Sequence, residues 1–163
     1  GDYAVNIMEK SEELSEKEAS FSDHAKEELK ILTGAMERIL DLTNDAFEND
    51  DMQLAVQVEP LEEVIDVLVE RLRAQHIGRL KDGQCSIDTG VVFLDVLNNV
   101  ERISDHCSNI AVYQIQVPKD EYDAHEYLQN VKHQEHAEFD REEMAYEKRY
   151  RLPDITRTAG AEV

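Results

Sequence analysis

Apolar residues recur along much of the chain at steps of three and four, which is the period of an α-helix that buries one face. The clearest series follows Ser22, a residue suited to a helix N-cap, and ends at a polar turn over 49–51. Its members are Ala25, Leu29, Leu32, Met36, Ile39, Thr43 and Ala46. This pattern predicts a long amphipathic helix that packs against antiparallel neighbours.

A second segment repeats the spacing, and the turn signal Asp82-Gly83 predicts that its helix ends near Lys81. Its apolar positions are Leu54, Val58, Leu61, Ile65, Leu68 and Leu72. Pro60 lies inside this run and lacks a backbone N–H. It therefore predicts either a kink or the true start of the helix, with Glu59 before it.

The third helix is expected to open near Ser86 or Asp88 and to end near Ile115, before a proline at position 118. It has the broadest apolar face of the three, which predicts that it is the most buried helix. Its apolar positions are Val91, Val92, Leu94, Val96, Leu97, Val100, Ile103, Cys107 and Ile110.

Four segments follow from these patterns, and the predicted fold class is all-α. Residues 19–117 are expected to form an antiparallel three-helix bundle, and residues 118–151 a mostly polar C-terminal helix. Residues 152–163 are expected to be a disordered tail. Residues 1–18 have a partial apolar stripe and begin without a cap, so they are expected to be the end of a helix that starts upstream.

The charge balance restricts the possible partners. The 163 residues include 37 acids and only 17 lysines and arginines, a formal net charge of −20. Phosphate backbones and anionic lipid surfaces would repel such a chain, so neither nucleic-acid binding nor direct lipid binding is expected. Nine Gly and Pro residues and no Trp are also too few for an all-β sandwich.

Sequence motifs of common enzymes are absent. The chain contains no GxGxxG, GxxxxGK[ST], CxxC, HExxH or GxSxG pattern, and no run of roughly 18–20 apolar residues that would span a membrane. Cys85 and Cys107 lie in different segments and are interpreted as free thiols in a reducing cytoplasm. The sequence therefore predicts a non-catalytic protein.

Two acidic pairs share the pattern E-x-x-x-D, namely Glu62 with Asp66 and Glu101 with Asp105. This spacing places both carboxylates of a pair on one helix face, about one turn apart. Two adjacent antiparallel helices could then present four carboxylates to one patch, a donor set suited to iron, manganese or magnesium.

Spacing alone does not establish a metal site, because so acidic a chain contains several such pairs by chance. A solvated acidic face is the alternative. The context favours a site, since a polar row of Asn98, Glu101, Asp105 and Asn109 follows an otherwise apolar helix. Polar groups on a packed helix face destabilise the fold unless something satisfies them.

An internal similarity adds a fifth candidate ligand. Residues 1–7 align with residues 104–110, and Asp2 falls on Asp105, with an Asn and an Ile also shared. This predicts that the chain begins inside the last helix of a preceding repeat, as part of a longer protein. Asp2 would then be the aspartate of a third acidic pair.

The stretch Glu101-Arg102-Ile103-Ser104-Asp105, continued by Asn109-Ile110, resembles the signature E-R-I-G-D-x-x-x-N-I of PhoU-like proteins. The family has a second E/D-x-x-x-D on the preceding helix, which Glu62 and Asp66 match. Its fold is a three-helix bundle repeated twice. Ser104 departs from the family glycine, which leaves the carboxylates in place.

A subgroup of this family is also similar. Residues 58–66, 76–80 and 84–86 resemble the PhoU-like regions of bacterial sodium/phosphate cotransporter proteins, in which a membrane domain precedes a cytoplasmic PhoU-like tail. The resemblance implies a cytoplasmic regulatory domain for phosphate uptake. Its expected partners are the membrane domain of the same polypeptide and, through self-association, a second copy of the chain.

The family resemblance also implies a transition-metal site. The candidate ligands are Glu62, Asp66, Glu101, Asp105 and Asp2, with iron as the first choice and zinc, nickel or manganese as alternatives. A different function stays open on the residues alone. The chain could be a stand-alone or metal-free helical interaction module of phosphate signalling, whose acidic pairs are merely solvated.

Overall fold

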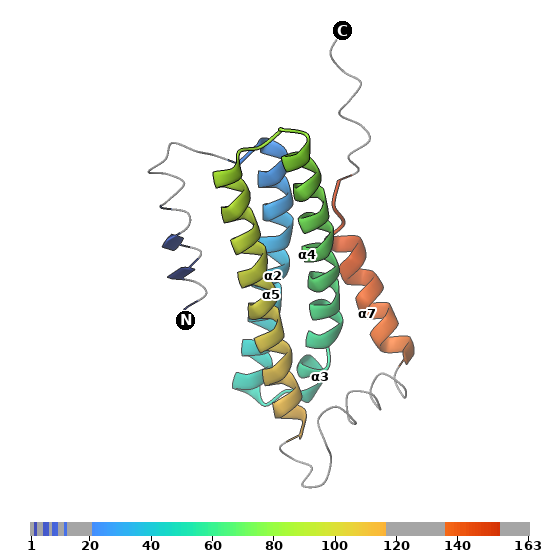
Figure 1. The fold of residues 1–163 in the computed structure, drawn as a ribbon. Coiled ribbons are helices and arrows are strands. Elements are labelled where there is room, and N and C mark those ends of the chain that lie inside the picture. Colours follow the sequence, from blue (N-terminus) through green and yellow to red (C-terminus); the bar gives the residue numbers. More distant parts are fainter. Residues whose placement is uncertain are drawn as a thin grey trace.

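The computed structural model describes residues 21–116 and 136–153, together with Asp2, Val5, Asn6, Met8, Glu9 and Glu12. Within these residues every regular element is a helix, so the predicted all-α class is confirmed. Three long helices, α2 (Asp23–Asn49), α4 (Val58–Lys81) and α5 (Ile87–Gln116), form an antiparallel bundle (Figure 1). A short α3 (Met52–Ala55) precedes α4, and α7 (His136–Arg149) lies beside α4 (Figure 1).

Local capping sets the bounds of α2. The Ser22 hydroxyl accepts a hydrogen bond from the Ala25 N–H at 3.2 Å, as predicted for an N-cap. At the other end Asp50 adopts a left-handed conformation with φ of 50°, and its N–H is donated to the Ala46 and Phe47 carbonyls. This conformation ends α2 and turns the chain toward α3.

The apolar positions from Leu54 to Leu72 do not belong to a single helix. The structure divides the run into α3 and α4, and Pro60 is the third residue of α4. A proline is tolerated there because the first N–H groups of a helix have no partner within it. The helix thus begins at Val58, close to the predicted start, and it ends at Lys81 as predicted.

The third predicted helix is α5. The Ser86 hydroxyl accepts from the Thr89 N–H at 3.2 Å, so Ser86 lies at the N-terminus that the sequence suggested. Gly83, with φ of 67°, provides the sharp turn between α4 and α5. This short connection holds the two helices side by side over most of their length.

The core fills the space between α2, α4 and α5. Its largest fully buried apolar side chains are Leu32, Ile39, Leu42, Leu61, Ile65, Leu72, Phe93 and Leu97. The predicted series on α2 faces this core, with Leu29 and Met36 packed at its edge. None of the described helices has the length and apolar character needed to cross a membrane.

Tyr146 of α7 and Tyr150, the residue after the helix, attach this segment to the bundle. Tyr146 and Tyr150 are both buried, and the Tyr150 hydroxyl donates to the Gly34 carbonyl of α2 at 3.3 Å. The predicted helix over 118–151 is described only from residue 136 onward, and residues 154–163 of the predicted tail lie outside the described residues.

Candidate metal centre

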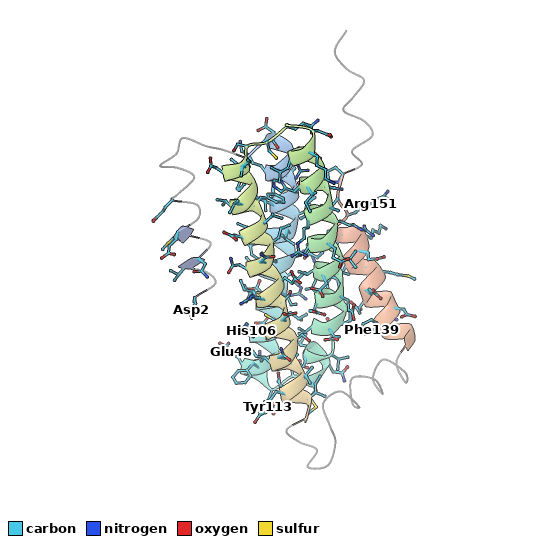
Figure 2. All side chains as sticks on the ribbon, viewed as in Figure 1. Asp2, Glu48, His106, Tyr113, Phe139 and Arg151 are labelled. Carbon is cyan, nitrogen blue, oxygen red and sulfur yellow. The ribbon has the colours of Figure 1, made fainter. Side chains whose placement is uncertain are left out.

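A row of acidic side chains follows one face of α4. Glu59, Glu62 and Asp66 are separated by three and four residues, so they lie within two turns of each other on the same face. Helix α5 runs antiparallel beside this face and contributes Asp105. Figure 2 shows the neighbouring His106 on α5, in the half of the bundle where α4 begins.

Carboxylate oxygens come close together in two overlapping groups. Glu62, Asp66 and Asp105 each offer one oxygen within 4.8 Å of the others, and so do Glu59, Glu62 and Glu63. Glu62 belongs to both groups and is therefore the centre of the cluster. We call Glu59, Glu62, Glu63, Asp66 and Asp105 the carboxylate cluster.

Proton affinities in the cluster are strongly raised. Burial, followed by the charges of Asp66 and Glu59, raises the pKa of Glu62 from 4.5 to about 8. Burial and the charges of Asp105 and Glu101 raise the pKa of Asp66 from 3.8 to about 6. Both shifts have the same physical origin, because desolvation and like charges each disfavour the ionised carboxylate.

The donor set fits a cation. The Oδ1 atom of Asp66 is buried, and none of the described residues donates a hydrogen bond to it. A buried carboxylate oxygen without a donor destabilises the fold unless a proton or a cation satisfies it. All the candidate metal-ligand atoms are carboxylate oxygens, which suit hard or borderline cations.

Hydrogen bonds at the edge of the cluster involve its member Glu59 and the neighbouring Glu101, which lies outside it. Ser108 donates to Glu59 at 2.6 Å. Arg73, two turns beyond Asp66 on α4, donates to Glu101 at 2.8 Å and to Asn98 at 2.9 Å. Glu101 thus pairs with a cation instead of joining the three closest carboxylates, although its charge still reaches Asp66.

The five ligands predicted from the sequence therefore separate. The structure brings Glu62, Asp66 and Asp105 together, and Glu101 lies at their edge in its ion pair with Arg73. Asp2 is exposed, and the close carboxylate groups among the described residues do not include it.

The sequence analysis did not select Glu59 and Glu63. Their signal was the spacing of Glu59 from Glu62 and Asp66 on one helix face, which is hidden among the many acids of this chain.

Ser104 stands where the PhoU-like signature has glycine, and its side chain is completely buried. Its hydroxyl donates to the Glu101 carbonyl at 2.8 Å and lies 3.3 Å from the Val100 carbonyl. The hydroxyl is thus satisfied within α5, and the substitution leaves no unpaired polar group beneath the cluster.

A second polar cluster lies at the opposite end of the bundle. Glu28 on α2 is completely buried and accepts two hydrogen bonds from Arg79 on α4, at 2.7 and 2.8 Å. The guanidinium also lies 5.6 Å from the centre of the Phe93 ring, on which buried His76 stacks. Burial and the charge of Arg79 lower the pKa of His76, which favours the neutral imidazole.

Comparisons with known proteins identify the family of the chain. A family model described as the PhoU domain matches residues 29–113, just over half of the chain. This chain belongs to the PhoU domain family. The matched region contains most of α2 and nearly all of α5, and it includes the whole carboxylate cluster. Helix α7 lies outside it.

A curated relative is the "Phosphate-specific transport system accessory protein PhoU homolog 1" of Thermotoga maritima. The two sequences are 29% identical over 110 residues, which cover 68% of this chain and 47% of the relative. This PhoU-domain chain thus spans about half the length of that protein. No solved structure matches the chain significantly.

Proposed function

We propose that this chain is a non-catalytic regulatory part of a phosphate uptake system. Membership of the PhoU domain family carries this proposal, and the name of the Thermotoga maritima relative, an accessory protein of phosphate-specific transport, supports it. The carboxylate cluster lies inside the family-matched residues, so the family region and the candidate site coincide.

A more specific context follows from the resemblance of residues 58–66 and 76–80 to PhoU-like regions of sodium/phosphate cotransporters. In this proposal the chain is the cytoplasmic part of such a transporter. Its partner is the membrane domain of the same polypeptide, and self-association with a second copy is a further expectation.

The carboxylate cluster is proposed to hold a transition-metal ion. Glu62, Asp66 and Asp105 are the proposed ligands, with iron first and zinc, nickel or manganese as alternatives. Glu101 is proposed to act from the edge, through its charge on Asp66. Asp2 stays a predicted ligand from the internal repeat.

A regulatory mechanism follows from the charges of the cluster. At neutral pH, Glu62 keeps its proton, and the carboxylates of α4 and α5 repel each other where the helices meet. Arg73 holds Glu101 in place by a hydrogen bond, and Ser108 does the same for Glu59. A bound cation would reduce this repulsion between α4 and α5. The packing of the two helices would therefore depend on whether the metal is bound.

Elemental analysis of protein purified without a chelator or a histidine tag tests the metal proposal. We expect about one metal ion or more per chain, and loss of that metal from the double variant Asp66→Asn, Asp105→Asn. The double variant Asp41→Asn, Asp45→Asn is the matched control, because it removes two exposed carboxylates of α2. Equal metal content in both variants would reject the assigned ligands.

An absence of metal after reconstitution with iron, zinc, nickel or manganese would favour the alternative, a metal-free helical interaction module. In that case the hydrogen bonds of Arg73 to Glu101 and of Ser108 to Glu59 would stabilise these two carboxylates without a metal. The wild-type chain and the variants should retain the same helical circular dichroism, so that a loss of metal is not a loss of fold.

Phosphate uptake in the source organism tests the regulatory role separately. Deletion of the coding sequence should change the initial rate of radiolabelled phosphate uptake, and the wild-type gene should restore it. The gene carrying Asp66→Asn and Asp105→Asn should not restore regulation if the cluster takes part. Uptake that is unchanged by the deletion at both low and high external phosphate would contradict the proposed function.

A further inference from the structure

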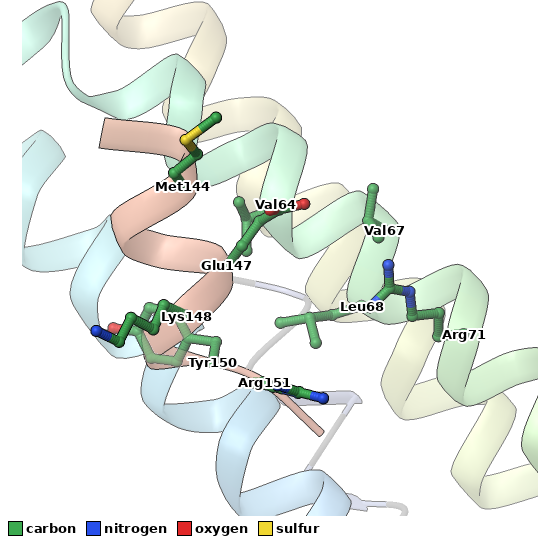
Figure 3. A pocket seen from close by; sticks show the side chains of 9 residues that line it. All are labelled: Val64, Val67, Leu68, Arg71, Met144, Glu147, Lys148, Tyr150 and Arg151. Carbon is green, nitrogen blue, oxygen red and sulfur yellow. The ribbon is translucent and has the colours of Figure 1, made fainter. Parts of the chain in front are cut away.

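A pocket of about 360 Å³ lies between α4 and α7 (Figure 3). Helix α4 contributes Val64, Val67, Leu68 and Arg71, and α7 with the residues after it contributes Met144, Glu147, Lys148, Tyr150 and Arg151. Small-molecule sites begin at roughly this size. Because α7 lies outside the PhoU-matched residues, this pocket combines the family bundle with an element of this chain.

The charge of the pocket is opposite to that of the chain. Arg71, Lys148 and Arg151 line it together with a single acid, Glu147. The chain as a whole has more than two acids for each basic residue. This local excess of positive charge would attract an anion.

Two of these cations have no carboxylate partner in the part of the chain that the structure describes. The other arginines of α4, Arg73 and Arg79, each hold a carboxylate at 2.7 or 2.8 Å. Arg71, on the same helix, and Lys148, on α7, form no such ion pair with a described residue. The charge of Arg71 is therefore available to a ligand in the pocket, whereas the Lys148 side chain is directed away from Arg71 (Figure 3).

The dipole of α7 accounts for only part of this arrangement. Cations in the last turn of a helix are favourable, which explains Lys148 and Arg149. It does not explain why Arg71, in the middle of α4, lines the same pocket. Arg149 does not line the pocket, and its guanidinium lies 5.4 Å from the centre of the Tyr150 ring.

The remaining lining is apolar and partly open to solvent. Val64, Leu68 and Tyr150 are buried at its base, whereas Val67 is 39% exposed and Met144 is 67% exposed. The hydrogen bond from Tyr150 to the Gly34 carbonyl fixes the position of this side chain, so the wall that it forms is already in place. Exposed apolar side chains beside unpaired cations suit a ligand with both an apolar body and a negative charge.

We propose that the pocket between α4 and α7 binds a small amphipathic organic anion, with the acidic group at Arg71 and the apolar body against Val67, Leu68 and Met144. This site is separate from the carboxylate cluster and from the proposed metal. It gives the chain a second input, an anionic small molecule.

Fluorescence titration with 8-anilinonaphthalene-1-sulfonate tests the site, because this probe joins a sulfonate to an aromatic body. We expect saturable binding of one probe per chain and an affinity reduced about tenfold in Arg71→Gln, since the charge-assisted contact is lost. The control Lys81→Gln removes the same charge from an exposed position of the same helix and should bind as the wild type does. Equal losses in both variants, or no saturation, would overturn the proposal.

Methionine methyl signals locate the probe independently of any charge variant. The chain has four methionines, Met8, Met36, Met52 and Met144, and only Met144 lines the pocket. In protein labelled with ¹³C-methyl methionine, the Met144 signal, assigned with Met144→Leu, should shift with the same saturation as the fluorescence. Saturating fluorescence with an unmoved Met144 signal would place the probe elsewhere and overturn the proposal.

Inorganic phosphate tests the chemical class of the ligand. It has the negative charge without the apolar body, so it should displace the probe only at much higher concentration, by about tenfold or more. If phosphate competed as strongly as the aromatic sulfonate binds, the apolar part of the proposal would be wrong. Such competition should leave the metal content of the protein unchanged, so failure here is distinguishable from failure of the proposed metal site.

Discussion

Helix α4 carries two charged sites that are built in opposite ways. Near its C-terminal end, Arg79 meets the completely buried Glu28 through two hydrogen bonds of 2.7 and 2.8 Å. Near its N-terminal end, Glu62 and Asp66 meet Asp105 of α5 without a cation among the three. The first site is neutralised within the fold, whereas the second is an accumulation of like charge.

This difference separates a structural role from a binding role. A buried ion pair with satisfied hydrogen bonds fixes how two helices align, because any other register would leave a charge buried alone. A carboxylate cluster with an unsatisfied Asp66 oxygen leaves free energy to be gained from a proton or a cation. The same helix therefore holds the bundle together at one end and is able to bind at the other.

The largest expected effect comes from breaking the neutralised site. Arg79→Met would leave the Glu28 charge buried without its main partner, and we expect a loss of about 3–5 kcal/mol in the free energy of unfolding. The matched control is Arg73→Met on the same helix. Its pair with Glu101 is 34% and 40% exposed, so the expected loss is only about 0.2–1 kcal/mol.

Urea unfolding of both variants measures this contrast. Similar losses for Arg79→Met and Arg73→Met would show that burial of Glu28 does not distinguish the two pairs. The double variant Glu28→Gln, Arg79→Met should recover part of the loss, because it removes the charge that Arg79→Met leaves uncompensated.

A smaller effect is expected when the unneutralised site receives a cation. At a free metal concentration about 100 times the dissociation constant, the folded state should gain about 2.7 kcal/mol. Thermal unfolding of chelator-treated protein with Mn²⁺ or Zn²⁺ added measures this gain. Asp66→Asn, Asp105→Asn should abolish it and Asp41→Asn, Asp45→Asn should retain it; a gain that survives both changes would belong to another site.

The smallest effect comes from the proton on Glu62. Its pKa in the folded chain, about 8, lies above the ordinary 4.5, so the folded state binds more protons between these values. Stability of the metal-free protein should therefore fall as pH rises from about 4.5 to about 8. Asp66, with a pKa of about 6, adds a fall between about 3.8 and 6.

The variant Glu62→Gln isolates this contribution. It should be more stable than the wild type at about pH 9 by roughly 1–2 kcal/mol, less than the full shift because the side chain is only half-buried. Chemical unfolding at several pH values, with chelator present, measures the difference. Glu48→Gln on the exposed face of α2 is the control, and parallel pH profiles for wild type and Glu62→Gln would refute the assignment.

Local pattern was sufficient for the helices. The spacing from Ala25 to Ala46 and the cap at Ser22 predicted α2, and the turn at Gly83 predicted the boundary between α4 and α5. These signals depend on residues close together in the sequence, so they can be recognised without knowing the fold. The division at α3 was less clear, because both sides of Pro60 carry the same apolar spacing.

The candidate site was only partly accessible in this way. The E-x-x-x-D spacing selected Glu62, Asp66 and Asp105, which the structure places together, but it equally selected Glu101, which pairs with Arg73. The spacing describes one helix at a time. Which acid of α5 faces which residue of α4 depends on how far the two helices slide past each other.

The sequence by itself determined the all-helical class, the three long helices of the bundle and the two E-x-x-x-D pairs, since each depends on local spacing. Tertiary structure alone decided the register of α4 against α5, the burial of Glu28 against Arg79 and the basic pocket beneath α7. Burial and opposing charges depend on residues distant in the chain. They act only after the helices have packed. They decide which charges are neutralised within the fold, such as Glu28 by Arg79, and which are not, such as the carboxylate cluster.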